Sequence, residues 1–232
     1  MEQHQENNII CVTNRSLCED ISVFFEKIQN IAKAEPYSII LREKDLSEDE
    51  YLSLALRVST LCCSTGTRLF VHCYPMAALK CSADGLHMPL HRLKEYMEAC
   101  PEEADMVLSR MKYLGASCHS VEDALLAESL GCNYIVAGHI FDTDCKKGLP
   151  GRGINFLKNV VNAVSIPVFA IGGINKENFH KIKEAGASGA CLMSSLMISN
   201  TPAEMINTLR SSASISTISS HSSFPSAPSS YT

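Results

Sequence analysis

The sequence predicts a single α/β domain folded as a (β/α)8 TIM barrel. Short apolar segments of strand-forming residues alternate with segments of helical periodicity along most of the 232 residues. The apolar segments are continuous rather than alternating, which is typical of parallel strands buried on both faces. Eight such strand and helix pairs fit a closed barrel. An open, doubly wound sheet is the alternative, although no Gly-x-Gly-x-x-Gly motif follows the first strand.

Each predicted strand is a short apolar run that ends in polar or small residues. The runs span residues 8–13, 37–41, 68–71, 85–87, 113–118, 134–137, 167–171 and 187–193. The predicted helices span residues 21–31, 47–61, 76–80, 120–130, 154–161, 176–185 and 202–210. Ser47 and Glu50 have the spacing of a capping box, which indicates a helix start. Residues 90–111 mix helix and turn signals around Pro101, so no single element is predicted there.

The end of the chain differs in composition from the rest. Residues 211–232 include 11 serines and two prolines. Such a segment buries too little apolar surface to offset the entropy lost on ordering. We therefore expect a domain of residues 1–210 followed by a disordered Ser-rich tail.

Charge and hydropathy exclude two kinds of partner. The net charge is -5 and no basic stripe is present, so we expect no nucleic-acid partner. No apolar run reaches the roughly 18 residues of a membrane helix, and residues 1–8 carry no apolar signal segment. We expect a cytoplasmic protein without a membrane partner.

The cysteines are many but do not form a metal-binding pattern. There are 11 of them, an odd number without a Cys-x-x-Cys pair, and reduced thiols are expected. One scatter of potential zinc ligands comprises His72, Cys73, Cys81, His87 and His91. Pro89 separates the two last histidines and argues against a shared helical turn. We expect no metal and no cofactor.

Basic, imidazole and hydroxyl groups collect where the predicted strands end, which is the active-site face of such barrels. The residues at these strand ends are Thr13, Arg15, Arg42, Lys44, His72, His87, His119, His139, Gly172, Gly173, Ser194 and Ser195. The glycine and serine pairs follow the seventh and eighth strands, whose loops bind phosphate in many barrels. We predict a phosphate site at Gly173, Ser194 and Ser195.

A long polar loop, residues 138–153, follows the sixth strand. Loops of this length in a compact domain are usually functional or disordered, although a solvated surface loop is the simpler interpretation. His139 stands at its start and Lys146 near its middle. Lys147 is interpreted as a solvated charge.

Several motifs together resemble the thiamine phosphate synthase/TenI family over residues 9 to about 200. They are Val12-Thr-Asn-Arg15, Leu41-Arg-Glu-Lys44, Ala83-Asp-Gly-Leu-His87, Ser117-Cys-His-Ser120 and Ile166-Pro167 through Ala170-Ile-Gly-Gly-Ile174. The segment Gly138-His-Ile-Phe-Asp-Thr-Asp-Cys-Lys-Lys-Gly148 is similar to the TenI branch. That resemblance implies a thiazole tautomerase, an isomerase of thiamine biosynthesis that makes a carboxythiazole phosphate aromatic by proton transfer.

In that interpretation His139 is the catalytic acid and base, because imidazole titrates near neutrality. His119 is the second candidate for this proton transfer. Arg42, Lys44 and Lys146 are expected to hold the carboxylate and phosphate of the substrate. The relatives also suggest a homo-oligomer.

Two alternatives remain: a thiamine phosphate synthase that uses Mg²⁺, and a non-catalytic TenI-like regulatory protein. The resemblance implies that synthases bind Mg²⁺ through two aspartates. Cys73 and Arg92 stand at the corresponding positions here. Because Mg²⁺ prefers carboxylate oxygens, the sequence argues against the synthase.

Overall fold

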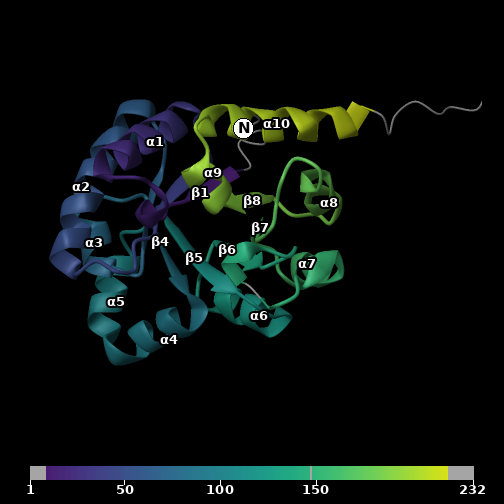
Figure 1. Ribbon diagram of the computed structural model, residues 1–232. Coiled ribbons are helices and arrows are strands. Elements are labelled where there is room, and N and C mark those ends of the chain that lie inside the picture. Colours follow the sequence, from purple (N-terminus) through teal and green to yellow (C-terminus); the bar gives the residue numbers. More distant parts are fainter. Residues whose placement is uncertain (1–8, 147, 219–232) are drawn as a thin grey trace, which may run out of the picture.

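Eight parallel strands close into a barrel in the computed structural model, which describes residues 9–146 and 148–218 (Figure 1). Each strand pairs with its neighbours in the chain, and β1 pairs with β8 to complete the ring. The strands are β1 (Ile9–Val12), β2 (Ser38–Leu41), β3 (Leu69–His72), β4 (Gly85–Pro89), β5 (Tyr113–Cys118), β6 (Tyr134–Gly138), β7 (Val168–Ile171) and β8 (Gly189–Leu192). The predicted (β/α)8 barrel is confirmed.

Helices follow the strands and surround the barrel (Figure 1). They are α1 (Ile21–Lys33), α2 (Glu48–Thr65), α3 (Pro75–Lys80), α4 (Leu90–Ala99), α5 (Pro101–Leu108), α6 (Val121–Ser129), α7 (Gly153–Ala163), α8 (Phe179–Glu184), α9 (Ser194–Ile198) and α10 (Pro202–Ile218). Short 3-10 helices, η1 (Arg15–Leu17) and η2 (Asp144–Lys146), lie in the loops after β1 and β6. None of the helices in the described ranges is long and apolar enough to cross a membrane.

The structure resolves the segment for which the sequence signals conflict. Residues 90–111 form α4 and α5, and Pro101 is the first residue of α5, where its missing N–H breaks no intrahelical hydrogen bond. The capping box of Ser47 and Glu50 is confirmed at the start of α2. The short helix α9 was not predicted, and α10 continues to Ile218, beyond the predicted domain end at residue 210. The remainder of the predicted tail, residues 219–232, lies outside the described residues.

The interior of the barrel is filled by aromatic rings on the side of the strand starts. Phe70, Tyr134 and Phe169 are buried there, with the Tyr134 ring centroid 5.4 Å from that of Phe70 and 6.1 Å from that of Phe169. Gly115 lies beside Tyr134 in the sheet, and a Cβ at this glycine would overlap the tyrosine ring. The Arg68 guanidinium covers the Tyr37 ring at 4.9 Å. Side chains of the described residues therefore fill the barrel near the strand starts, and its open side is at the carboxyl ends of the strands.

Candidate active site

A cavity of about 1510 Å³ opens at the carboxyl ends of the strands. It is lined by residues that follow β1 to β8, and its floor is formed by apolar side chains inside the barrel, among them Val12, Ile40, Val136 and Cys191. Ligand sites for one small molecule usually measure about 300–1,000 Å³. This cavity therefore has room for more than one small substrate.

The loop after β7 exposes its backbone to this cavity. Gly172 has φ 99° and Gly173 φ 64°, a left-handed conformation that favours glycine. A Cβ at Gly173 would overlap the carbonyl oxygen of Asp142, so only glycine fits against the neighbouring loop. Asn178 donates from Nδ2 to the carbonyl oxygen of Gly173 at 2.8 Å and holds this peptide in place. The backbone can thus approach an anion closely.

Ser194 and Ser195 lie beside this loop, in the first turn of α9 directly after β8. Both line the cavity together with Gly172 and Gly173. The structure therefore brings together the glycine and serine residues for which a phosphate site was predicted. Their hydroxyl groups and the glycine backbone give this part of the cavity a small and polar lining.

Three predicted cationic residues also line the cavity. Arg42 and Lys44 follow β2, and Lys146 lies in η2, in the loop after β6. The positive charge of Arg42 lowers the pKa of Lys44; partial burial and the charges of Lys146 and Arg92 act in the same direction. Within the described ranges no ion pair joins any of these four cations to a carboxylate. We call Arg42, Lys44, Arg92 and Lys146 the basic cluster.

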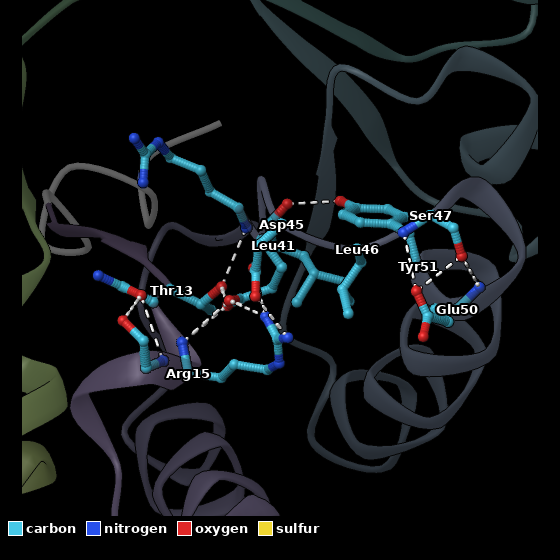
Figure 2. Close-up of polar contacts among 12 residues, drawn as sticks. Thr13, Arg15, Leu41, Asp45, Leu46, Ser47, Glu50 and Tyr51 are labelled. Atoms are coloured by element: carbon cyan, nitrogen blue, oxygen red, sulfur yellow. Dashed lines mark hydrogen bonds and ion pairs between the residues drawn. The ribbon is translucent and has the colours of Figure 1, made fainter.

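Arg15, in contrast, is neutralised by its neighbours. Its guanidinium contacts Asp45 at 2.6 and 2.7 Å and Glu43 at 3.3 Å (Figure 2). The buried Glu43 also accepts the Thr13 hydroxyl at 2.6 Å, and the backbone N–H of Arg42 donates to Thr13 Oγ1 at 2.9 Å. This network joins the ends of β1 and β2. Because neighbouring residues in extended chain point to opposite sides, burial of Glu43 directs Arg42 and Lys44 toward the cavity.

Two buried histidines, His72 and His87, lie at the cavity floor. His72 and His87 are paired across β3 and β4, with ring centroids 6.1 Å apart. His87 Nδ1 lies 3.0 Å from Tyr134 Oη, and its Nε2 lies 2.8 Å from Ser117 Oγ. Burial lowers the pKa of His72 to about 2, and repulsion between the protonated forms of His72 and His87 acts in the same direction. Burial alone lowers the pKa of His87 to about 3. Both rings are neutral near pH 7 and offer polar atoms without charge.

His119 and His139 line the cavity nearer its mouth. His119 Nδ1 donates to the carbonyl oxygen of Gly138 at 2.8 Å, since a carbonyl can only accept. His139 Nε2 likewise donates to the carbonyl oxygen of Leu149 at 3.2 Å. The His139 ring therefore connects β6 to the far part of the long loop.

Backbone hydrogen bonds fold the long loop back on itself. Asp142 Oδ1 accepts the N–H of Gly151 at 2.7 Å. The N–H of Arg152 donates to the carbonyl oxygen of His139 at 3.0 Å, and that of Gly153 donates to Ile140 at 2.9 Å. These contacts set the position of Lys146 at the cavity. Lys147 lies outside the described residues.

Sequence reasoning missed several residues that position the site. Tyr134 and Ser117 fix the His87 ring, Asn178 holds the Gly173 peptide, and Glu43 joins β1 to β2. The role of Glu43 could have been predicted, because a carboxylate between two cationic residues at a strand end suggests a buried ion-pair partner. Asn178 carried none, because a single asparagine at a helix start suggests only a cap.

The fold and this cavity define a (β/α)8 barrel with a candidate small-molecule site at the carboxyl ends of its strands. The chain belongs to the thiamine monophosphate synthase family, whose sequence profile matches residues 9–196. The thiamine-phosphate synthase of Syntrophomonas wolfei is 33% identical over 195 residues, which cover 84% of this chain and 90% of the relative. That of Methanosarcina barkeri is 38% identical over 162 residues, 68% of this chain and 70% of the relative.

A solved structure agrees with these sequences. The thiamine phosphate pyrophosphorylase of Pyrococcus furiosus is 27% identical, with a TM-score of 0.74 over 91% of this chain and 97% of that one. 3-Hexulose-6-phosphate synthase, at 16% identity and a TM-score of 0.65, shares the fold alone.

These comparisons correct the predicted reaction. The chain was expected to be an isomerase of the thiazole tautomerase kind, but its curated relatives at about 30% identity over most of the chain are named thiamine-phosphate synthase, which is a transferase. The prediction relied on the likeness of one loop to the TenI branch and on Cys73 and Arg92 at the positions of the two aspartates. Similarity to thiamine-phosphate synthases over most of the chain outweighs these local features.

The residues present do not fit the Mg²⁺ that the synthase resemblance implies. Cys73 follows β3 as a half-buried thiol, and burial raises its pKa, so it is not an anionic ligand. Arg92 lies in the first turn of α4 and would repel a cation. Across residues 9–146 and 148–218, no three His, Cys, Asp or Glu side chains are grouped to hold a metal ion. Mg²⁺ prefers several oxygen ligands, and Cys73 and Arg92 provide none.

Proposed function

We propose that this protein is a transferase of the thiamine-phosphate synthase kind, which joins a pyrimidine carried on pyrophosphate to a thiazole phosphate. The observation that supports this proposal is the presence of two separate sets of anion-binding groups in one cavity. One set is the backbone at Gly173, Ser194 and Ser195. The other is the basic cluster, of which Arg42, Lys44 and Lys146 line the cavity, while Arg92 lies in α4 close enough for its charge to act on Lys44.

The first set suits the single phosphate of the thiazole substrate. Gly173 lets the chain approach phosphate oxygens, and Ser194 and Ser195, which carry hydroxyl groups, line the cavity beside it. A phosphate fixed there leaves the thiazole ring over the cavity floor. Because Ser117, His72 and His87 form a polar but uncharged part of that floor, they can orient a neutral ring by hydrogen bonding.

The second set suits the pyrophosphate of the other substrate. Transfer breaks the bond between the pyrimidine-bearing carbon and a pyrophosphate oxygen, and the same carbon bonds to the thiazole. Pyrophosphate leaves with the electron pair, so negative charge grows on its oxygens. Cations already positioned beside them stabilise that charge without reorganisation. Arg42, Lys44 and Lys146, which line the cavity, are the candidates for this role.

The test is direct formation of product. The purified chain is incubated with the pyrimidine pyrophosphate and the thiazole phosphate, with Mg²⁺ and separately with EDTA, and thiamine phosphate and released pyrophosphate are measured. We expect both products in equal amounts in at least one condition. Their absence in both conditions would refute the proposed function. As a control, Arg110→Asp changes an exposed charge just before β5, at the opposite end of the barrel, and should leave turnover unchanged.

A further inference from the structure

The positions that hold acidic metal ligands in the resembled synthases carry no negative charge in this chain. Cys73 is a neutral thiol 3.7 Å from His72 Nε2, and Arg92 brings a positive charge to the same place. Among the charged groups that act on Cys73, Arg92 comes first, followed by Lys44 and Arg42. Three cations therefore act on the end of β3, and none of them forms an ion pair with a carboxylate within the described part of the chain.

Two cations outside the basic cluster, Arg15 and Lys94, form ion pairs with carboxylates among the described residues. Arg15 has Glu43 and Asp45, and Lys94 lies 3.7 Å from Glu98. Arg42, Lys44, Arg92 and Lys146 have no such partner among the described residues, although like charges brought together repel one another. A bound anion with several negative charges would remove this repulsion.

Two acidic residues, Asp142 and Asp144, also line the cavity, in the loop after β6. Asp142 accepts the N–H of Gly151, and among the described residues neither carboxylate forms an ion pair with the basic cluster. The start of α4, where Arg92 lies, has no side-chain cap, and its dipole favours an anion as well. Charge and backbone thus favour the same kind of ligand.

We propose that Arg42, Lys44 and Arg92 bind the diphosphate group of a substrate directly and take the place of a divalent cation. Guanidinium groups suit this task because they contact phosphate oxygens with two N–H groups at once. The ligand class is an organic or inorganic diphosphate that is not complexed with Mg²⁺. This inference rests on the proposed function for the identity of the organic part, but the binding itself can be tested without it.

The probe is inorganic pyrophosphate, titrated into the full chain by calorimetry in metal-free buffer with EDTA and again with Mg²⁺. We expect binding in EDTA and weaker or equal binding with Mg²⁺, because the magnesium complex carries less negative charge. A site that holds pyrophosphate through a bridging metal ion would instead bind it more tightly with Mg²⁺ than in EDTA. Binding that requires Mg²⁺, or no binding in either buffer, overturns the inference, whereas failure to form thiamine phosphate affects only the proposed function.

Variants locate the site. Arg92→Asp should weaken pyrophosphate binding in EDTA about tenfold or more, the usual effect of losing a charged hydrogen-bonding partner. Arg110→Asp makes the same charge change at the far end of the barrel and should leave the affinity unchanged. The double variant Cys73→Asp with Arg92→Asp supplies two carboxylates and should make binding depend on Mg²⁺. Thermal unfolding verifies that each variant is folded; equal affinity in folded Arg92→Asp and Arg110→Asp would exclude this location.

Discussion

His72 and His87 should make the stability of this protein fall as the solution is acidified from pH 7 to pH 5. Both side chains are buried, with 6% and 3% of their surface exposed, and their pKa values are lowered from near 6.5 to about 2 and about 3. Between those values and 6.5 the unfolded chain binds protons that the folded chain does not. Stability is therefore fully present above pH 6.5 and is lost as the pH falls toward the folded pKa values.

The magnitude follows from this difference in proton binding. At pH 5 each histidine is almost fully protonated in the unfolded chain and neutral in the folded one. Integration from pH 7 to pH 5 gives about 2 kcal/mol for each histidine and about 4 kcal/mol for the pair. A total of this size is a large part of the 5–15 kcal/mol that is typical for a domain.

The measurement is the free energy of unfolding in urea at several values between pH 7 and pH 5, for the native chain and for His72→Phe. Phenylalanine keeps a ring in the buried space but cannot be protonated, so the loss of stability over this range should fall by about half. His180→Asn, at an exposed position of α8, is the matched control and should keep the native dependence. An unchanged pH dependence in His72→Phe would show that His72 is not held neutral by burial.

Two further substitutions test the packing of the strand ends and of the barrel interior. Gly173→Ala should weaken binding of the thiazole phosphate about tenfold or more, because the added Cβ overlaps the Asp142 carbonyl oxygen. The dissociation constant is measured by calorimetry. Gly66→Ala is the control: it introduces the same left-handed strain with open space around the new Cβ, and it should bind normally. Gly115→Ala pushes a methyl group into the Tyr134 ring and should lower the free energy of unfolding by about 1–3 kcal/mol, the usual cost of overpacking. The measurement is unfolding in urea. Unchanged stability would contradict the close packing of Gly115 against the Tyr134 ring.

Similarity to thiamine-phosphate synthases over most of the chain contradicts the predicted reaction, and the loop after β6 shows how little a local motif decides. The loop of residues 138–148 places His139 at a strand end, as predicted, but the Nε2–H of this ring is engaged by the Leu149 carbonyl. A histidine in such a loop can serve its folding, its ligand or its chemistry, and a local motif does not separate these roles. The similarity over residues 9–196 carries more weight than one loop.

The sequence by itself determined the barrel, because apolar runs and helical periodicity are local properties that survive in a linear chain. It also located Arg42, Lys44, Lys146, Gly173 and the serine pair at one face, since the carboxyl ends of parallel strands share that face. Only the tertiary structure decided which of these groups stay charged and unpaired. Arg15 and Arg42 look alike in the sequence, yet one meets Glu43 and Asp45 and the other faces the cavity. Such differences depend on contacts between strands, and distance in space cannot be read from separation along the chain.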